Sequence, residues 1–232
     1  RQYIDYAISC SNFAKDSYTG LTSAKEHFVT FLGADLSSNF QTKKNKSDNN
    51  LHMCCLANTE KRKGLDILIK SFGKLEHTNK KLFLIGKISK KWFISYCEEY
   101  KIEVENIILT GPIPQQNLAD FLLNQEIDLH ILASRFDSFG MVVPETMSLG
   151  IANILSPFVG ASEMLENNVD GFIMNSLNTA SLSLCIQNYL RLSTQEKNTL
   201  IRKVLKKSKQ MTWDNYNKRI HLIFDKISTI NK

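Results

Sequence analysis

The sequence predicts an α/β fold built on a doubly wound parallel sheet, with extra helices at its C-terminal end. Two observations support this prediction. Short apolar segments of strand length alternate along the chain with amphipathic segments of helix length. Several strand segments, among them 82–85 and 107–109, are apolar at every position, which is typical of a parallel sheet covered by helices on both faces.

Two periodicities predict the individual elements in order. Strands are expected at the short apolar runs 3–9, 27–32, 51–56, 81–85, 106–109, 128–132, 152–155 and 171–174. Helices are expected where apolar side chains recur at helical spacing: Leu65, Leu68, Ile69 and Phe72; Trp92, Phe93, Tyr96 and Tyr100; Leu118, Phe121 and Leu122. Each of these helices would connect two parallel strands of one sheet.

Two segments depart from the alternation. Residues 41–50 are polar and charged without periodicity, which predicts an exposed loop or linker between a small N-terminal piece and the main α/β unit. Residues 178–230 contain no convincing strand and predict two or three successive helices.

Composition narrows the class of protein. The 232 residues suffice for one full domain with a surplus too short for a second. The 43% of apolar and 22% of charged residues exclude disorder and coiled coil. No apolar run reaches the length of a membrane helix. The five scattered cysteines predict small buried side chains in a reducing compartment rather than disulfides or metal ligands.

The net charge of +6 leaves the kind of partner open. It fits nucleic acid, an anionic membrane surface or a phosphorylated small molecule, and it fits equally a lysine-rich surface exposed to solvent. Trp92 is compatible with a membrane or nucleic-acid patch together with Lys87, Lys90 and Lys91, but a helix that covers the sheet is the favoured interpretation. His130 lies in an apolar strand and is interpreted as a core histidine rather than a catalyst.

The binding loops are expected between residues 64 and 171. All four prolines and eight of the ten glycines fall in this window. In a doubly wound sheet the ligand lies beyond the carboxyl ends of the strands, where the loops need tight backbone turns.

The densest group of candidate residues lies at 134–150. A strand is followed there by Asp137 and by a helix that begins between residues 139 and 144 and ends at Gly150. Backbone N–H groups at such a turn favour an anionic or hydroxyl-rich ligand. The alternative is an ordinary loop in which Glu145 only compensates the helix dipole.

This group resembles the signature of the family 4 retaining glycosyltransferases, which have the GT-B fold. The signature is two acidic residues with seven positions between them, in the form Glu-x-Phe-Gly-x-x-x-x-Glu-Ala-x-x-x-Gly, followed by Gly-x-x-Glu and Gly-Phe. The matching residues here are Asp137, Phe139, Gly140, Glu145 and Gly150, then Gly160, Glu163, Gly171 and Phe172. Lys63 and Gly64 resemble the Lys-Gly segment at the first helix of the family's donor domain.

The resemblance extends over nearly the whole chain and implies three parts. Residues 1–45 resemble the incomplete end of an N-terminal acceptor domain and the linker, on the pattern of residues 4–13, Gly33 to Asp35 and Phe40. Residues 46–211 resemble the Rossmann-like domain that binds a nucleotide-sugar donor. Residues 212–232 resemble the C-terminal helix that crosses back toward the N-terminal domain.

The resemblance also implies a role for each candidate residue. Lys63, Asp137 and Glu145 would be catalytic: Lys63 neutralises the diphosphate, Asp137 holds the transferred sugar, and Glu145 binds the ribose hydroxyls. The segment Ser138, Phe139, Gly140, Met141 and Val142 would bind sugar and phosphate oxygens, chiefly through its backbone. Gly111 and Pro112 would cover the base, with a plain turn as the alternative interpretation of 109–113.

The implied activity is retaining transfer of a sugar from a nucleotide diphosphate sugar to a saccharide or lipid-linked acceptor, in cell-surface glycan synthesis. The resemblance implies no cofactor, no metal and no nucleic-acid partner. It implies a cytoplasmic location, with the inner face of the membrane as the alternative. Association with the membrane would then be peripheral and through the acceptor domain.

Two departures from the family pattern keep other functions open. Ala57 and Asn58 stand where the family usually has a Gly-Arg phosphate ligand, for which Lys61 or Arg62 could substitute. The first acid is Asp137 rather than Glu. The alternatives are a sugar-nucleotide epimerase of the GT-B fold and a non-catalytic nucleotide-sugar-binding module. A nucleic-acid-binding Rossmann-like domain ranks third, because the positive charge is spread along the chain.

Overall fold

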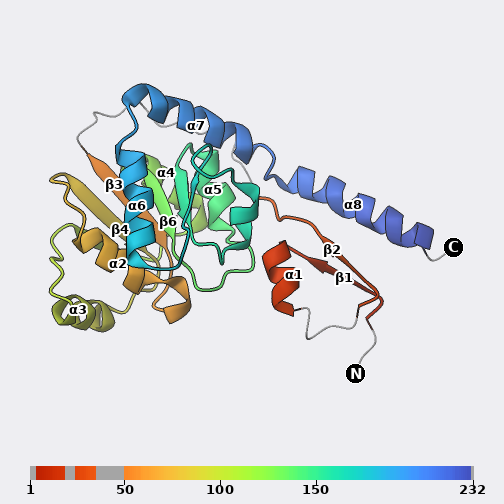
Figure 1. Ribbon diagram of the computed structural model, residues 1–232, viewed down its shortest axis with the longest axis horizontal. Helices are drawn as coiled ribbons and strands as arrows, with labels where there is room; N and C mark the ends of the chain where they lie inside the picture. Colours follow the sequence, from red (N-terminus) through yellow and green to blue (C-terminus); the bar gives the residue numbers. More distant parts are fainter. Residues whose placement is uncertain (1–3, 19–23, 35–49, 231–232) are drawn as a thin grey trace.

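The computed structural model describes residues 4–18, 24–34 and 50–230. Six parallel strands form the main sheet in the order β5-β4-β3-β6-β7-β8 (Figure 1). They are β3 (Leu51–Leu56), β4 (Lys80–Ile85), β5 (Ile107–Gly111), β6 (Leu129–Leu132), β7 (Ala152–Leu155) and β8 (Phe172–Ile173). The chain order reverses between β3 and β6, so the sheet is doubly wound, as the sequence predicts.

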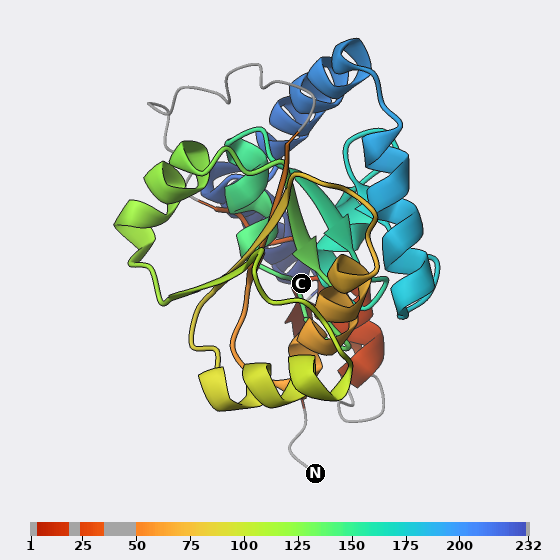
Figure 2. The same cartoon turned by 90° about the vertical axis from the view of Figure 1, so that its left-hand side faces the viewer.

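Helices cover both faces of this sheet. On one side lie α2 (Leu65–Gly73), α3 (Lys90–Glu99) and α6 (Thr179–Leu190), and on the other lie α4 (Gln115–Asn124) and α5 (Val142–Ser148) (Figure 2). α7 (Thr194–Ser208) packs against α5, and the 3-10 turns η1 (Lys61–Lys63) and η2 (Gly160–Met164) occupy two of the connections. The favoured interpretation of Trp92 is confirmed, because α3 covers the sheet with Phe93 and Cys97 buried.

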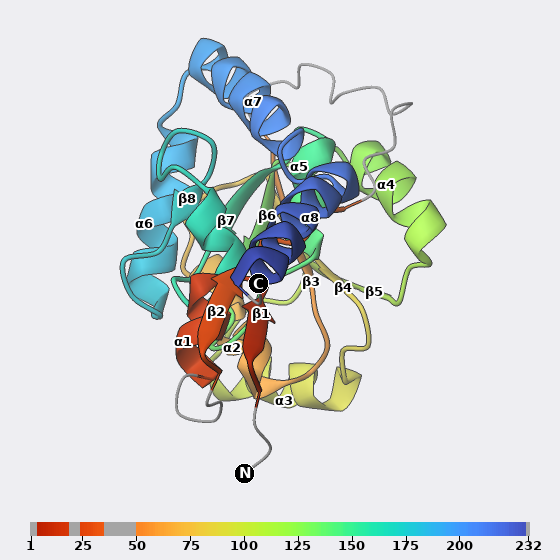
Figure 3. The same ribbon diagram turned by 90° about the vertical axis from the view of Figure 1, so that its right-hand side faces the viewer.

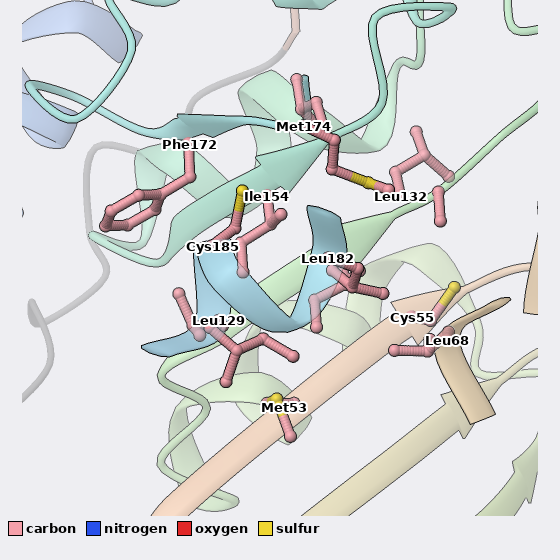
Figure 4. Close-up of a cluster of buried hydrophobic side chains, with 14 of the residues drawn as sticks. Met53, Cys55, Leu68, Leu129, Leu132, Ile154, Phe172, Met174, Leu182 and Cys185 are labelled. Atoms are coloured by element: carbon pink, nitrogen blue, oxygen red, sulfur yellow. The ribbon is translucent and has the colours of Figure 1, made fainter. Parts of the chain in front are cut away.

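Apolar side chains fill the space between the sheet and its helices. Figure 4 shows Met53 and Cys55 of β3 beneath Leu182 and Cys185 of α6, and all four side chains are buried. A second cluster on the opposite face joins β3 and β4 to Leu118 and other residues of α4. The five cysteines are free thiols, and four of them are buried, as the sequence predicts.

A smaller unit is built from both ends of the described chain. β1 (Tyr6–Ser9) and β2 (Glu26–Val29) form a separate two-stranded parallel sheet beside α1 (Asn12–Tyr18). Two or three C-terminal helices are predicted and three are observed; the last of them, α8 (Trp213–Ile230), lies next to this small sheet (Figure 3).

Polar contacts hold α8 against the N-terminal segment. Arg219 donates to the carbonyl of Phe31 at 2.6 Å, and Lys226 pairs with Glu26 at 3.7 Å. Ala34 forms a parallel bridge with Thr212. This bridge lies at the border between the small unit and the main unit, on both segments that connect them. Among the described residues, no helix combines the length and the apolar composition that crossing a membrane requires.

The observed strand ends differ from the predicted ones by a few residues. The predicted strand 3–9 is observed as Tyr6–Ser9, and 27–32 as Glu26–Val29. β5 continues to Gly111, beyond the predicted end at 109, because the carbonyl of Gly111 accepts from the amide of Gly86 at 3.0 Å. The predicted loop 41–50 lies, except for its last residue, outside the described residues, as do Asp35 and Phe40.

His130 is a core residue. Its ring is fully buried in β6, and its Nδ1 lies 2.6 Å from Oδ1 of Asn153 on the neighbouring strand β7. Burial lowers the pKa of His130 to about 4, although the hydrogen bond with Asn153 opposes this shift. The imidazole is therefore neutral near pH 7 and packs as part of the interior.

This histidine should make the fold sensitive to mild acid. The unfolded chain binds a proton near pH 6.5 and the folded chain only near pH 4, so stability present above about pH 6.5 is lost as the pH falls. The loss by pH 5 should be about 2 kcal/mol. Urea unfolding at pH 7.5 and pH 5 measures it. His130→Gln should remove this contribution, whereas His221→Gln, at an exposed position of α8, should retain it. Equal pH dependence in wild type and His130→Gln would contradict the prediction.

Candidate functional site

The strand order brings two loops together at the centre of the sheet. β3 and β6 are neighbours, so the loops that follow them, 57–64 and 133–141, meet at the carboxyl edge. We call this meeting place the switch point. The amide of Arg135 donates to the carbonyl of Arg62 at 2.7 Å, and Arg135 Nη1 donates to the carbonyl of Lys61 at 2.6 Å. The two loops therefore form one connected surface.

A glycine permits this close approach. Gly64 ends η1 with a φ of 67°, in the left-handed region. A Cβ atom on Gly64 would overlap the carbonyl oxygen of Ala133. Only a residue without a side chain lets the turn that carries Lys63 pack directly onto the end of β6.

Lys63 and Asp137 form an ion pair at the switch point. The distance from Lys63 Nζ to Asp137 Oδ2 is 2.8 Å, and the side chains are only 19% and 14% exposed. The guanidinium of Arg62 lies 3.9 Å from the same oxygen and pairs with Glu60 at 3.0 Å. Two cations, each held by a carboxylate, are therefore in place at the carboxyl edge of the sheet.

A second ion pair fixes α2 to the loop after β6. Both guanidinium nitrogens of Arg135 donate to the carboxylate of Asp66, at 2.8 and 2.7 Å. Burial raises the pKa of Asp66, but the Arg135 guanidinium outweighs this effect and the pKa is lowered. The pair stays ionised well into the acidic range and holds the geometry around the Lys63–Asp137 pair.

The segment from Asp137 to α5 rests on the loop after β7. The amide of Asp137 donates to the carbonyl of Phe158 at 2.9 Å, and its own carbonyl accepts from Gly160 at 2.9 Å. The carbonyl of Phe139 accepts from Ala161 at 2.7 Å. These bonds use the amide of Asp137 and the carbonyl groups of Asp137 and Phe139, and they fix the course of the segment.

The next five backbone amides, those of residues 138–142, make no such bonds to described residues. None of the backbone N–H groups of residues 138–142 donates a hydrogen bond to a described residue. Backbone donors in a row can bind several oxygens of an anionic or hydroxyl-rich ligand. The five predicted ligand residues thus present free backbone donors beside the Lys63–Asp137 pair.

The N-terminal segment packs against this loop. The hydroxyl of Ser11 donates to the carbonyl of Ser138 at 2.6 Å. Glu163 accepts from the amides of Asn12 at 2.9 Å and Phe13 at 2.6 Å. Glu163, which matches the family's Gly-x-x-Glu motif, therefore caps α1 and ties the N-terminal segment to the main unit.

Glu145 lies in the first turn of α5, apart from the ion pair. Its Oε1 accepts from Nε2 of Gln115, the first residue of α4, at 2.9 Å. Burial raises the pKa of Glu145, and the hydrogen bond from Gln115 opposes this shift. A cavity of about 280 Å³ lies between α4 and α5, lined by Glu145 and Gln115 together with Met141 and Trp213.

Gly111 and Pro112 lie two strands away from the switch point. Gly111 ends β5, and Pro112 is exposed. No interaction among the described residues joins either of them to Lys63 or Asp137. The structure thus brings Lys63, Asp137 and the 138–142 backbone together, places Glu145 beside a cavity, and leaves Gly111 and Pro112 at the far end of the same edge.

The structure shows which cation lies closest to the Lys63–Asp137 pair in the absence of the family's Gly-Arg pair, whose positions are held by Ala57 and Asn58. Asn58 donates to Glu60 at 2.7 Å, and its Oδ1 is buried without a partner among the described residues. The side chain of Lys61 is exposed. Arg62 is therefore the candidate substitute that the structure places at the Lys63–Asp137 pair.

Sequence reasoning did not single out Gln115, Arg135 or Ser11. Gln115 begins a helix, a position that carries no chemical signal by itself. Arg135 lies two residues before Asp137, and this proximity to the motif was the only signal that could have identified it.

A comparison of the sequence with models of known protein families identifies the family of this chain. The model of the family described as glycosyl transferases group 1 matches residues 37–207 of the chain. The chain belongs to the glycosyl transferases group 1 family. Lys63, Asp137 and Glu145 all lie within the residues that the family model matches.

Three individual proteins are similar to this chain, each at low sequence identity. A sucrose synthase from Melioribacter roseus is 20% identical over 186 residues, which are 71% of this chain and 24% of that protein. Sucrose-phosphate synthase from Thermosynechococcus elongatus has a TM-score of 0.79 at 16% identity, over 97% of this chain and 59% of that one. HepE of Anabaena, solved with UDP-glucose, has a TM-score of 0.76 at 19% identity, over 96% and 64%.

These likenesses show the fold. The main unit is the Rossmann-like sheet found in glycosyltransferases of the GT-B fold, as the sequence predicts. The chain spans less than two thirds of the length of each of these relatives.

Proposed function

We propose that this chain is the donor-binding part of a family 4 retaining glycosyltransferase, placed C-terminal to an acceptor domain. The observation that carries the proposal is the switch point, where the Lys63–Asp137 ion pair lies beside the free amides of residues 138–142. Membership of the glycosyl transferases group 1 family supports it. The UDP-glucose complex of HepE, which shares the fold, supports a nucleotide sugar as the donor, and UDP and UDP-glucose are therefore the first ligands to test.

Each part of the site has a proposed ligand group. Lys63 and Arg62 bind the diphosphate, and the 138–142 backbone binds phosphate and sugar oxygens. Asp137 accepts from hydroxyls of the transferred sugar. Glu145 accepts from the ribose hydroxyls, since Gln115 occupies only one of its two oxygens. The loop of Gly111 and Pro112 covers the base.

The proposed reaction needs no nucleophile from the protein. The bond between the anomeric carbon and the diphosphate oxygen breaks, and the acceptor oxygen bonds to that carbon on the same face. The acceptor proton passes to the leaving diphosphate. Negative charge grows on the diphosphate as the bond breaks, and the ammonium of Lys63 stabilises it in the transition state. The proposal assigns no metal and no cofactor.

The domain boundaries remain part of the proposal. Residues 1–45 belong to an acceptor domain with its linker, 46–211 to the donor domain, and 212–232 to the crossing helix. The exposed apolar side chains of α8 support this division, because none of its residues is buried; among them Leu222 is 68% and Phe224 is 53% exposed. The acceptor is a saccharide or a lipid-linked glycan of the cell surface, and the enzyme acts in the cytoplasm or at the inner face of the membrane.

A thermal-shift screen against nucleotide diphosphates and their sugars tests the proposal. A ligand at about 100 times its dissociation constant should stabilise the fold by about 2.7 kcal/mol. Glu145→Ala should abolish the shift given by the best ligand. Ser228→Ala, at an exposed position of α8, should retain it. No shift with any nucleotide, or an unchanged shift in Glu145→Ala, would overturn the site.

Product analysis separates transfer from the alternative reaction. Incubation of the full-length protein with the best donor should yield no epimerised nucleotide sugar in the absence of an acceptor. Release of such a product would favour a sugar-nucleotide epimerase of the GT-B fold instead.

Arg62 should supply the second cation for the diphosphate. Arg62→Ala should weaken UDP binding about fivefold, a modest effect because the guanidinium is partly exposed and shared with Glu60. Lys61→Ala removes an exposed cation of the same turn and should change the affinity less than about twofold. Isothermal titration calorimetry measures both, and equal effects of the two substitutions would contradict the assignment.

A further inference from the structure

A second cavity opens on the other side of the loop that carries Lys63. It has a volume of about 380 Å³ and lies between the 59–61 loop, the first turn of α2 and α3. Its lining residues are Thr59, Glu60, Lys61, Leu65, Asp66, Trp92 and Tyr96. None of these residues belongs to the donor site proposed above.

Two aromatic rings form one wall of this cavity. The rings of Trp92 and Tyr96 are stacked, with centroids 5.3 Å apart and planes inclined by 22°. The hydroxyl of Tyr96 donates to the carbonyl of Asp66 at 2.9 Å, which fixes the ring against the first turn of α2. Both side chains are only half-buried, although α3 already anchors itself to the core through Phe93 and Cys97. Tyr96 also packs on Tyr100, with ring centroids 4.8 Å apart, and Lys70 Nζ lies 5.5 Å from the Tyr96 ring. The stack is therefore preformed, and the half-buried Trp92 ring is the end of it that a ligand can cover.

The two carboxylates around these rings are neutralised by arginines, and Lys61 adds an exposed ammonium at the rim. Asp66 is paired with both guanidinium nitrogens of Arg135, and Glu60 is paired with Arg62. A carboxylate that is already neutralised attracts a cation weakly, but its remaining lone pairs still accept hydrogen bonds from hydroxyl groups. The cavity thus offers hydrogen-bond acceptors without net negative charge.

We propose that this cavity is a saccharide-binding site, distinct from the donor site. A pyranose ring presents a face of C–H groups, which packs on an aromatic ring, and a rim of hydroxyls, which bond to carboxylates. An uncharged oligosaccharide matches both walls. The site lies at the carboxyl edge of the same sheet as the donor site, where it would hold a part of a glycan remote from the reacting end.

Tryptophan fluorescence provides a direct test. The chain has two tryptophans, so a Trp213→Phe variant leaves Trp92 as the only indole. The probes are maltohexaose, cellohexaose and chitohexaose. At least one should change the emission of Trp92 saturably. In the wild-type chain, whose donor site is intact, 1 mM UDP should leave the affinity for that oligosaccharide unchanged in calorimetry. The absence of a saturable change with all three would overturn the proposal, and so would displacement by UDP, which would place binding in the donor site.

Calorimetry with the best probe tests the residues in an otherwise wild-type chain. Trp92→Ala should weaken binding about tenfold or more, while Trp92→Phe should recover part of the loss. Ile94→Ala removes a 41%-exposed apolar side chain from the same helix and should leave the affinity unchanged. Unchanged binding in Trp92→Ala would refute the site. Binding of tetramethylammonium in place of the oligosaccharide would also refute it, because it would show a cation site.

These tests do not depend on the donor. Failure to bind any nucleotide would leave the saccharide titration unaffected, and failure of the saccharide titration would leave the nucleotide screen unaffected. The two proposals can therefore fail separately.

Discussion

Lys63→Ala should weaken the binding of UDP about 10- to 100-fold, measured by isothermal titration calorimetry. A charge-assisted hydrogen bond to a shielded group contributes about 1.5 to 3 kcal/mol, which corresponds to this range. Lys63 is well shielded, since its side chain is 19% exposed and already orders itself against Asp137. Lys63→Arg keeps the charge but requires more room, so it should restore only part of the affinity.

Asp137→Asn should not weaken the binding of UDP, in contrast to Lys63→Ala. The Asp137 carboxylate competes with phosphate for the Lys63 ammonium and repels the diphosphate, so its removal should leave UDP binding equal or tighter. The additional affinity that the sugar contributes in UDP-glucose should be lost, because an amide accepts fewer hydroxyl hydrogen bonds than a carboxylate. Weaker binding of UDP to Asp137→Asn would show that Asp137 orders the site instead of contacting the sugar.

Gly64→Ala should destabilise the fold strongly, although the substitution adds only one methyl group. A Cβ on Gly64 would overlap the carbonyl of Ala133, and backbone atoms cannot move aside as a flexible side chain can. We expect a loss of at least about 3 kcal/mol in urea unfolding, from backbone strain and displacement of the loop together.

Gly111→Ala is the matched control for this prediction. Gly111 has a similarly positive φ of 74°, but nothing lies within 4 Å of the position its Cβ would take. Gly111→Ala should therefore lower the free energy of unfolding only by the cost of the positive φ, about 1 kcal/mol. Equal losses at the two glycines would show that the contact with Ala133 relaxes without cost.

The sheet could be predicted from the sequence because its strands are apolar on both faces. Runs such as Leu82 to Ile85 have few other stable locations in a folded chain, and the helices between them show clear amphipathic spacing. The ends of β5 were harder to predict, since Gly111 and Pro112 indicate a turn. The bond from Gly86 to Gly111 extends the strand, and no local pattern encodes a bond between residues so far apart.

The site was predictable to the extent that it follows a linear motif. Lys63 and Asp137 are 74 positions apart, and the doubly wound topology alone implies that the loops after β3 and β6 meet. The partner of Glu145 could not be predicted in this way. Gln115 reaches it only because α4 and α5 lie on the same side of the sheet, which depends on their packing rather than on any spacing in the sequence.

The bridge between Ala34 and Thr212 has a practical consequence for dissecting the molecule. At this point the chain enters and leaves the main unit through adjacent positions, so the small lobe of β1, β2 and α8 is discontinuous in sequence. A cut at either place alone would leave half of that lobe without its counterpart. Isolating the main sheet unit requires a cut at both places. Because the two new ends would lie side by side, a short linker could join them, and the unit could then be circularly permuted.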